Sequence, residues 1–108
     1  MNSLPLPLDI AEEARYDIAE IVFYFAEQAP EVVGRFYQAL NKTFHQLASA
    51  PNLGERCRFR NPKTKGMRVW QVSGFSNYLI FYCPKDDELQ ILRVFHGARD
   101  YAKIFNKK

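Results

Sequence analysis

MRVWQVSGFSNYLIFYCPKDDELQILRVF, residues 67–95, contains three runs that are typical of β-strands, at 67–72, 78–83 and 89–95. Aromatic and β-branched residues dominate the runs, and turn-forming residues at 73–77 and 84–87 separate them, which favours hairpin connections. Just upstream, RCRFR at 56–60 alternates strictly, with three arginines on one face and Cys57 and Phe59 on the other. We therefore expect a four-stranded antiparallel meander.

Both faces of the later strands are largely apolar, because YLIFYC at 78–83 has no charged residue on either side. A surface this apolar must be shielded from water. We expect helices from the amino-terminal half to cover one face. The short tail at 98–105 or a partner chain covers the other.

The amino-terminal half predicts an edge element and two helices. LPLPL at 4–8 interleaves leucine with proline, which cannot donate to a sheet, so it indicates an edge strand or an extended arm. Apolar residues at helical spacing predict one helix from about Glu12 to before Pro30 and another from about Pro30 to Ala50. The short break between them favours an antiparallel hairpin. With a short carboxy-terminal helix, the fold class is α+β.

Length and composition limit the class of protein. At 108 residues the chain has room for one domain, 1–108, and 47% hydrophobic residues exclude a disordered chain. No apolar run approaches the roughly 20 residues of a membrane span, and the start of the chain lacks signal-peptide features, so we expect a cytoplasmic protein without membrane contact. Two cysteines, Cys57 and Cys83, and two histidines at unrelated spacings make no metal-ligand set, and we expect no metal or cofactor.

Charge is distributed unevenly along the chain. Residues 1–54 carry three Lys or Arg against seven Asp or Glu, whereas residues 55–108 carry twelve against five. A basic patch of Arg56, Arg58, Arg60, Lys63 and Lys65 is the densest part of the basic half. It predicts binding to a polyanion such as nucleic acid or an acidic protein segment. The alternative is a solvated edge whose charges prevent aggregation.

The segment at 91–101, ILRVFHGARDY, places a cation and a histidine among apolar residues. On a regular strand Arg93 shares a face with Ile91 and Phe95, so it needs a carboxylate or phosphate partner. His96 either titrates near neutral pH or satisfies a backbone carbonyl. Asp100 is a candidate cap for the tail helix.

Several of these segments resemble one known family. They are residues 14–21, FHQLASAPNLG at 44–54, Met67–Arg68, Tyr78–Tyr82 and, above all, RVFHGARD at 93–100. They resemble the ParE branch of the RelE/ParE toxins of type II toxin–antitoxin modules, known as plasmid stabilisation systems, over residues 6–101. The resemblance implies a helix hairpin on a small antiparallel sheet and a cognate antitoxin partner. We expect apolar and acidic segments of that antitoxin to lie across the open sheet face and the basic patch.

The resemblance implies one of two activities. ParE-like members inhibit DNA gyrase, whereas RelE-like members are endoribonucleases that cut messenger RNA on the ribosome. For a nuclease the candidate catalytic residues are His96, Arg99 and Arg68, but the tail position expected to hold a tyrosine falls near Phe105, which has no proton to give. We therefore favour the gyrase inhibitor.

Under the inhibitor interpretation, the expected target contacts are Arg68, Arg93, Arg99 and the tail from Tyr101 to Lys108. A third hypothesis is a degenerate, non-toxic member that only binds an antitoxin.

Overall fold

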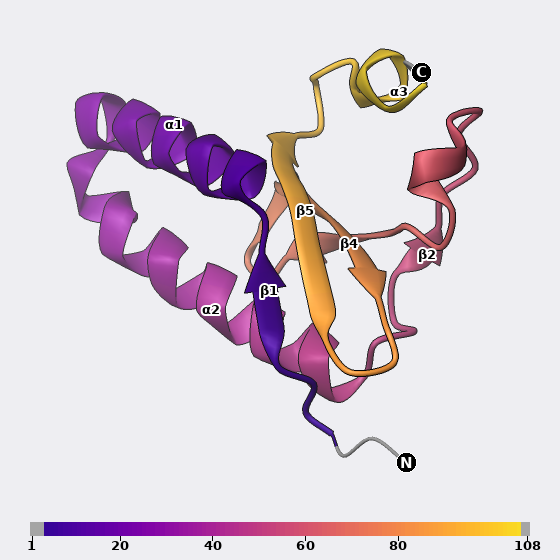
Figure 1. Ribbon diagram of the computed structural model, residues 1–108. Helices are drawn as coiled ribbons and strands as arrows, with labels where there is room; N and C mark the ends of the chain where they lie inside the picture. Colours follow the sequence, from indigo (N-terminus) through magenta and orange to yellow (C-terminus); the bar gives the residue numbers. More distant parts are fainter. Residues whose placement is uncertain (1–3, 107–108) are drawn as a thin grey trace.

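The computed structural model describes residues 4–106 and contains a five-stranded sheet with two long helices on one side (Figure 1). The strand order is β1-β5-β4-β3-β2; β1 runs parallel to β5, and the other neighbours are antiparallel. The elements are β1 (Leu8–Ile10), α1 (Glu12–Gln28), a 3-10 turn (Pro30–Val32), α2 (Val33–Ser49), β2 (Glu55–Arg56), a second 3-10 turn (Pro62–Thr64), β3 (Arg68–Val72), β4 (Phe75–Pro84), β5 (Leu89–His96) and α3 (Tyr101–Phe105). The α+β class is confirmed. None of the helices within residues 4–106 is long and apolar enough to span a membrane.

The helix hairpin follows the predicted pattern. Glu12 and Glu13 lie in the first turn of α1, where carboxylates interact favourably with the helix dipole. The helix ends before Pro30, whose ring suits the first position of the 3-10 turn that leads into α2. Each apolar stripe then faces the sheet.

Three strand boundaries differ from the prediction. The edge strand is not at 4–8 but at Leu8–Ile10, because the prolines limit sheet hydrogen bonding and the Leu6 N–H donates instead to the Ala48 carbonyl (2.9 Å). The strand predicted at 56–60 keeps only Glu55–Arg56 as β2, although Cys57 and Phe59 are half-buried and the arginines exposed, as the alternation predicts. The connection predicted at 73–77 is a two-residue turn, made possible by Gly74 at φ 78°.

A bulge at Leu92 changes the side-chain phase of β5. Ile91 lies opposite Tyr82 and Arg93 lies opposite Phe81, so Leu92 has no partner on β4. Consequently Arg93 shares a face with Phe95 but not with Ile91, which corrects the expectation from the sequence.

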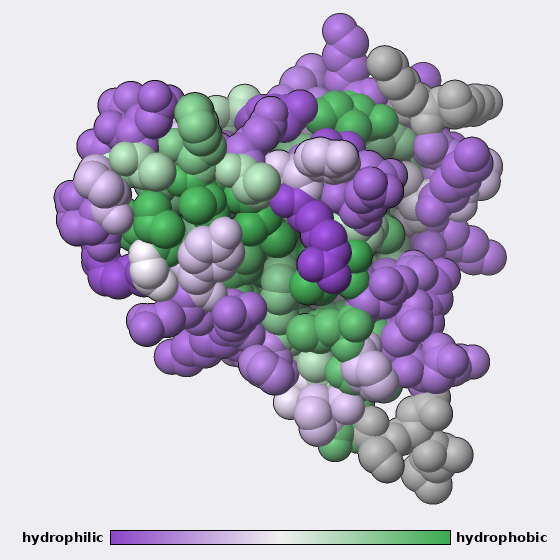
Figure 2. Space-filling view, turned by 60° about the vertical axis from the view of Figure 1, so that its left-hand side comes forward, coloured by the Kyte–Doolittle hydropathy of each residue, from purple (hydrophilic) through white to green (hydrophobic). Residues whose placement is uncertain are grey.

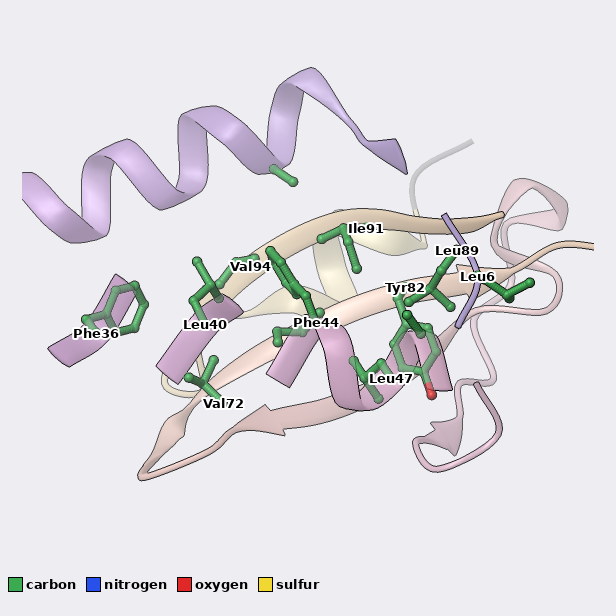
Figure 3. Close-up of a cluster of buried hydrophobic side chains, with 13 residues drawn as sticks. Leu6, Phe36, Leu40, Phe44, Leu47, Val72, Tyr82, Leu89, Ile91 and Val94 are labelled. Atoms are coloured by element: carbon green, nitrogen blue, oxygen red, sulfur yellow. The ribbon is translucent and has the colours of Figure 1, made fainter. Parts of the chain in front are cut away.

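Two apolar clusters lie on opposite faces of the sheet. Between the sheet and the hairpin are Leu6, Phe36, Leu40, Phe44, Leu47, Val72, Tyr82, Leu89, Ile91 and Val94 (Figure 3). On the other face Phe105 of α3 packs beside Phe81 and Phe95, with ring centroids 4.8 and 6.0 Å away, and Met67 completes this outer cluster. The tail is therefore the one of the two alternatives that covers this cluster, and shielding of the rest of this face by an antitoxin stays a prediction.

Candidate functional site

An ion pair joins α1 to the free edge of β5. β1 ends at Ile10, so beyond Ile91 the edge of β5 opposite β4 has no neighbouring strand, and α1 passes there instead. The Asp17 carboxylate accepts hydrogen bonds from Arg93 Nε (2.7 Å), Arg93 Nη2 (2.9 Å) and the Val94 N–H (3.0 Å). The hydrogen bonding of its guanidinium with Asp17 raises the pKa of Arg93 above its ordinary value, although burial opposes the shift. Arg93 therefore has the carboxylate partner that its position required.

A groove of about 330 Å³ lies beside this ion pair. It is lined by Asp17, Glu20, Ile21, Tyr24, Tyr78, Val94, Phe95, His96 and Arg99. The His96 ring meets Tyr78 edge to face at 5.1 Å, and His96 Nδ1 accepts from the Ala98 N–H (3.0 Å). With Nδ1 occupied in this way, the other ring nitrogen remains to interact with a ligand. Burial, reinforced by nearby Tyr24, raises the pKa of Tyr78.

Arg99 and Arg68 lie in different parts of the fold. Arg99 is exposed, and its guanidinium lies 4.7 Å from the centre of the Phe95 ring. Arg68 is half-buried, and its Nη1 donates to the carbonyls of Gly54 (2.7 Å) and Asn52 (3.3 Å).

The three residues expected of a nuclease are therefore not assembled. Arg68 pairs with Tyr82 and His96 pairs with Tyr78, on opposite sides of β4 and four residues apart along it. Four residues of strand span about 13 Å, and the two intervening strand spacings add about 10 Å sideways. The structure brings His96 and Arg99 to one groove and leaves Arg68 elsewhere.

The tail contributes to packing as well as to surface. The Tyr101 ring lies 5.1 Å from Phe81 and 6.5 Å from Phe59, so most of its ring faces the outer cluster. The Asp100 carboxylate caps α3 by accepting from the Lys103 N–H (3.2 Å), as anticipated from its position. Of the tail proposed for target contact, residues 107–108 lie outside the described residues.

The five residues of the basic patch are all exposed; Arg56 lies in β2, and the other four lie in the segment between β2 and β3. The Arg60 N–H donates to Asn106 Oδ1 (2.6 Å), which ties this loop to the end of α3. The loop that carries the patch therefore lies beside the end of α3.

Of the nine groove residues, sequence reasoning singled out only His96 and Arg99; the missed polar ones include Glu20, Tyr24 and Asp17, the partner of Arg93. The available signal was the position of Asp17, one residue before Ile18 on the apolar stripe of α1, where a buried carboxylate requires a partner. Glu20 is three residues after Asp17 and Tyr24 is seven residues after it, so both lie on the same side of the helix as Asp17.

Comparison with known proteins gives a consistent result. Residues 8–101 match a family model described as the ParE toxin of the type II toxin–antitoxin system parDE. A structure of the chromosomal ParDE toxin–antitoxin system from P. aeruginosa is similar at TM-score 0.67 and 21% identity, covering 87% of this chain and 98% of that one. The conserved hypothetical protein HP0894 from Helicobacter pylori is similar at TM-score 0.53 and 19% identity, covering 87% and 97%. Comparison with curated protein sequences gives no significant match.

Proposed function

Because the chain belongs to the ParE toxin family of type II toxin–antitoxin systems, we propose that it is a toxin that inhibits DNA gyrase in the cytoplasm and that a cognate antitoxin neutralises it. The observation that carries this proposal is the family match over residues 8–101, which includes the hairpin, the sheet and the segment at 93–100. The separation of Arg68 from His96 favours an inhibitor over the alternative, a ribosome-dependent endoribonuclease.

Arg99 is the residue that we propose for direct target contact. Its guanidinium is exposed, has a face on Phe95, and lies at the groove that also holds His96. Tyr101 supports the contact by fixing α3 against the sheet. Arg93 and Arg68 were expected to touch the target too, but their guanidinium groups hold Asp17 and the Gly54 carbonyl, so we assign them to positioning β5 and the start of β2.

Antitoxin binding is proposed at the basic patch rather than over the outer cluster. The five exposed cations along the loop are complementary to an acidic segment, and no hydrogen bond among residues 4–106 ties their side chains. An antitoxin segment there would also contact the tail through the Arg60–Asn106 connection.

The test is to measure gyrase supercoiling and ribosome-programmed messenger RNA cleavage with the same preparation. We expect supercoiling to stop while the message remains intact, and expect the neighbouring small gene product to restore supercoiling. Cleaved message with normal supercoiling would favour the nuclease. If expression of the chain alone is harmless and no neighbouring product binds, the toxin proposal fails.

A charge reversal separates target contact from folding. Arg99→Glu is expected to weaken gyrase inhibition while changing the free energy of unfolding by no more than about 1 kcal/mol, because the lost contact with Phe95 is at an exposed site. Arg35→Glu, an exposed position on α2, is the matched control and should leave inhibition unchanged. A large fall in melting temperature for Arg99→Glu would instead make Arg99 structural.

A further inference from the structure

α1 is apolar on the side that faces away from the core as well as on the side that faces it. The side chains of Tyr16 and Phe23 are 68% and 65% exposed, and Ala19 and Ala26 are exposed beside them. A shallow hollow follows this stripe, lined by Tyr16, Ala19, Glu20, Phe23, Tyr24 and Glu27. In Figure 2, hydrophobic surface lies over the hairpin side of the molecule, framed by hydrophilic side chains. Exposed aromatic residues in a row are typical of a protein contact.

The spacing of this stripe is that of a coiled-coil seam. Tyr16 and Phe23 are seven residues apart, and Ala19 and Ala26 each follow an aromatic residue by three. Large and small side chains therefore alternate at positions equivalent to a and d of a heptad, whose side chains pack between those of a facing helix. α1 has 17 residues, enough for two heptads about 26 Å long.

A row of glutamates runs along one side of the stripe. Glu13, Glu20 and Glu27 repeat every seven residues, and all three are exposed. Within residues 4–106 the Arg93–Asp17 pair is the one salt bridge, so none of these glutamates is within ion-pair distance of a cation there. In coiled coils such flanking positions select partners by charge.

We propose that the outer face of α1 is a docking surface for a basic amphipathic helix of another protein, with apolar side chains over Tyr16 to Ala26 and Lys or Arg opposite the glutamate row. The inference does not depend on whether the toxin acts on gyrase or on the ribosome. A second copy of this chain is the poorer occupant, because α1 exposes four glutamates against one cation, Arg15, and two such faces repel each other.

The experiment uses two designed helical peptides as probes. Both carry leucine at the heptad core positions; one has lysine at the flanking positions and the other has glutamate. Binding of each labelled peptide to the full chain is measured by fluorescence anisotropy. We expect the lysine peptide to bind and the glutamate peptide not to bind. Phe23→Gln is expected to lower the affinity for the lysine peptide at least about tenfold. Leu53→Gln, an exposed apolar position in the loop before β2, is the matched control and should bind normally.

A charge swap provides the second arm. The double variant Glu20→Lys and Glu27→Lys is expected to prefer the glutamate peptide, whereas Asp86→Lys and Asp87→Lys, in the turn between β4 and β5, has the same change in net charge and should keep the original preference. The proposal is overturned if neither peptide binds, if Phe23→Gln binds the lysine peptide normally, or if both double variants respond alike. It is also overturned if the chain alone dimerises in light scattering and Phe23→Gln restores the monomer, since the occupant is then a second copy.

Discussion

Asp17 is a single carboxylate that closes the exposed edge of a strand. Its side chain is 5% exposed and accepts from three donors, two on the Arg93 guanidinium and one on the β5 backbone. Paired Arg–carboxylate hydrogen bonds fix direction as well as distance. The residue therefore sets the angle at which α1 lies along β5, and with it the shape of the groove.

Loss of this carboxylate is expected to be costly. Asp17→Asn cannot accept both guanidinium hydrogen bonds, and it leaves a half-buried Arg93 without its counter-charge. We expect the free energy of unfolding to fall by about 2–4 kcal/mol, measured by urea denaturation. Glu27→Gln, an exposed position on the same helix, should change it by less than about 0.5 kcal/mol. Equal effects of the two variants would contradict a structural role for the pair.

The raised pKa of the Cys57 thiol makes the free energy of unfolding depend on pH. Burial, and secondarily the charge of Glu55, raises the pKa of Cys57 from 9.0 to about 11. Above about pH 9 the unfolded chain loses this proton while the folded chain keeps it, so the unfolded state binds fewer protons. The free energy of unfolding is therefore expected to fall as pH rises from about 9 to 11. The raised pKa values of Tyr78 and Tyr82 act in the same direction at higher pH.

Urea denaturation across this pH range checks the prediction. Cys57→Ala should flatten the fall, and Cys83→Ala, which removes a buried thiol elsewhere, controls for lost volume. A wild-type curve that stays level to pH 11 would show that the Cys57 thiol ionises at its ordinary pKa in the folded protein.

At the scale of elements, α3 covers part of the outer face of the sheet and leaves open a hollow lined by Val69, Leu79 and Tyr101. Only five residues long, it depends on packing rather than on helix propensity, because so short a helix is unstable alone. Its contribution is the Phe105 ring, inserted between Phe81, Phe95 and Phe59, while Asn106 ties its end to the basic loop.

Removing that ring tests whether the tail seals the sheet. Phe105→Ala is expected to lower the free energy of unfolding by about 2–3 kcal/mol, less than a central Phe→Ala because the tail can detach as a unit. Binding of the dye ANS should rise as the outer cluster becomes accessible. Lys103→Ala, exposed on the same helix, should alter neither quantity. Unchanged ANS binding in Phe105→Ala would mean that other segments seal this face.

The elements differ in how far the sequence predicts them. The helices and the strands β4 and β5 follow from periodicity and proline positions, which are local signals. The face on which each β5 side chain lies does not follow from the sequence, because a strand that is apolar on both faces gives no sign of a bulge. The partner of Arg93 lies 76 residues away, and the parallel pairing of β1 with β5 joins residues of similar separation. Local sequence patterns therefore predict α1 and β5 as separate elements, but not that α1 lies along β5 and completes the groove.

At the scale of the whole molecule, the two charged halves of the chain lie on different surfaces. The exposed glutamates follow α1, and the exposed arginines and lysines follow the loop between β2 and β3. The two sets approach each other at one hollow, lined by Glu13 and Lys63, and lie apart elsewhere, so the protein has an acidic side and a basic side. Each side can then attract a different class of partner at long range.

The basic side should determine the affinity for polyanions. Replacing Arg58, Arg60 and Lys63 with glutamine is expected to weaken binding to duplex DNA and to reduce the slope of log affinity against log salt by up to about 3, since each lost phosphate contact removes about 0.9. Replacing Arg15, Arg35 and Lys42, which are exposed on the hairpin, is the control with the same loss of charge. Equal slopes for the two triple variants would show that polyanions respond to net charge alone.

The extra residue at Leu92 has a consequence for which substitutions the strand tolerates. Before it, Leu89 and Ile91 point into the hairpin core; after it, Val94 does so and Phe95 points to the opposite side. In a saturation library, the alternation of permissive and restrictive positions along β5 should invert at this point. Deleting Leu92 would remove the extra residue and make the pairing with β4 regular, so Arg93 would follow Ile91 directly and every later side chain would keep its present face.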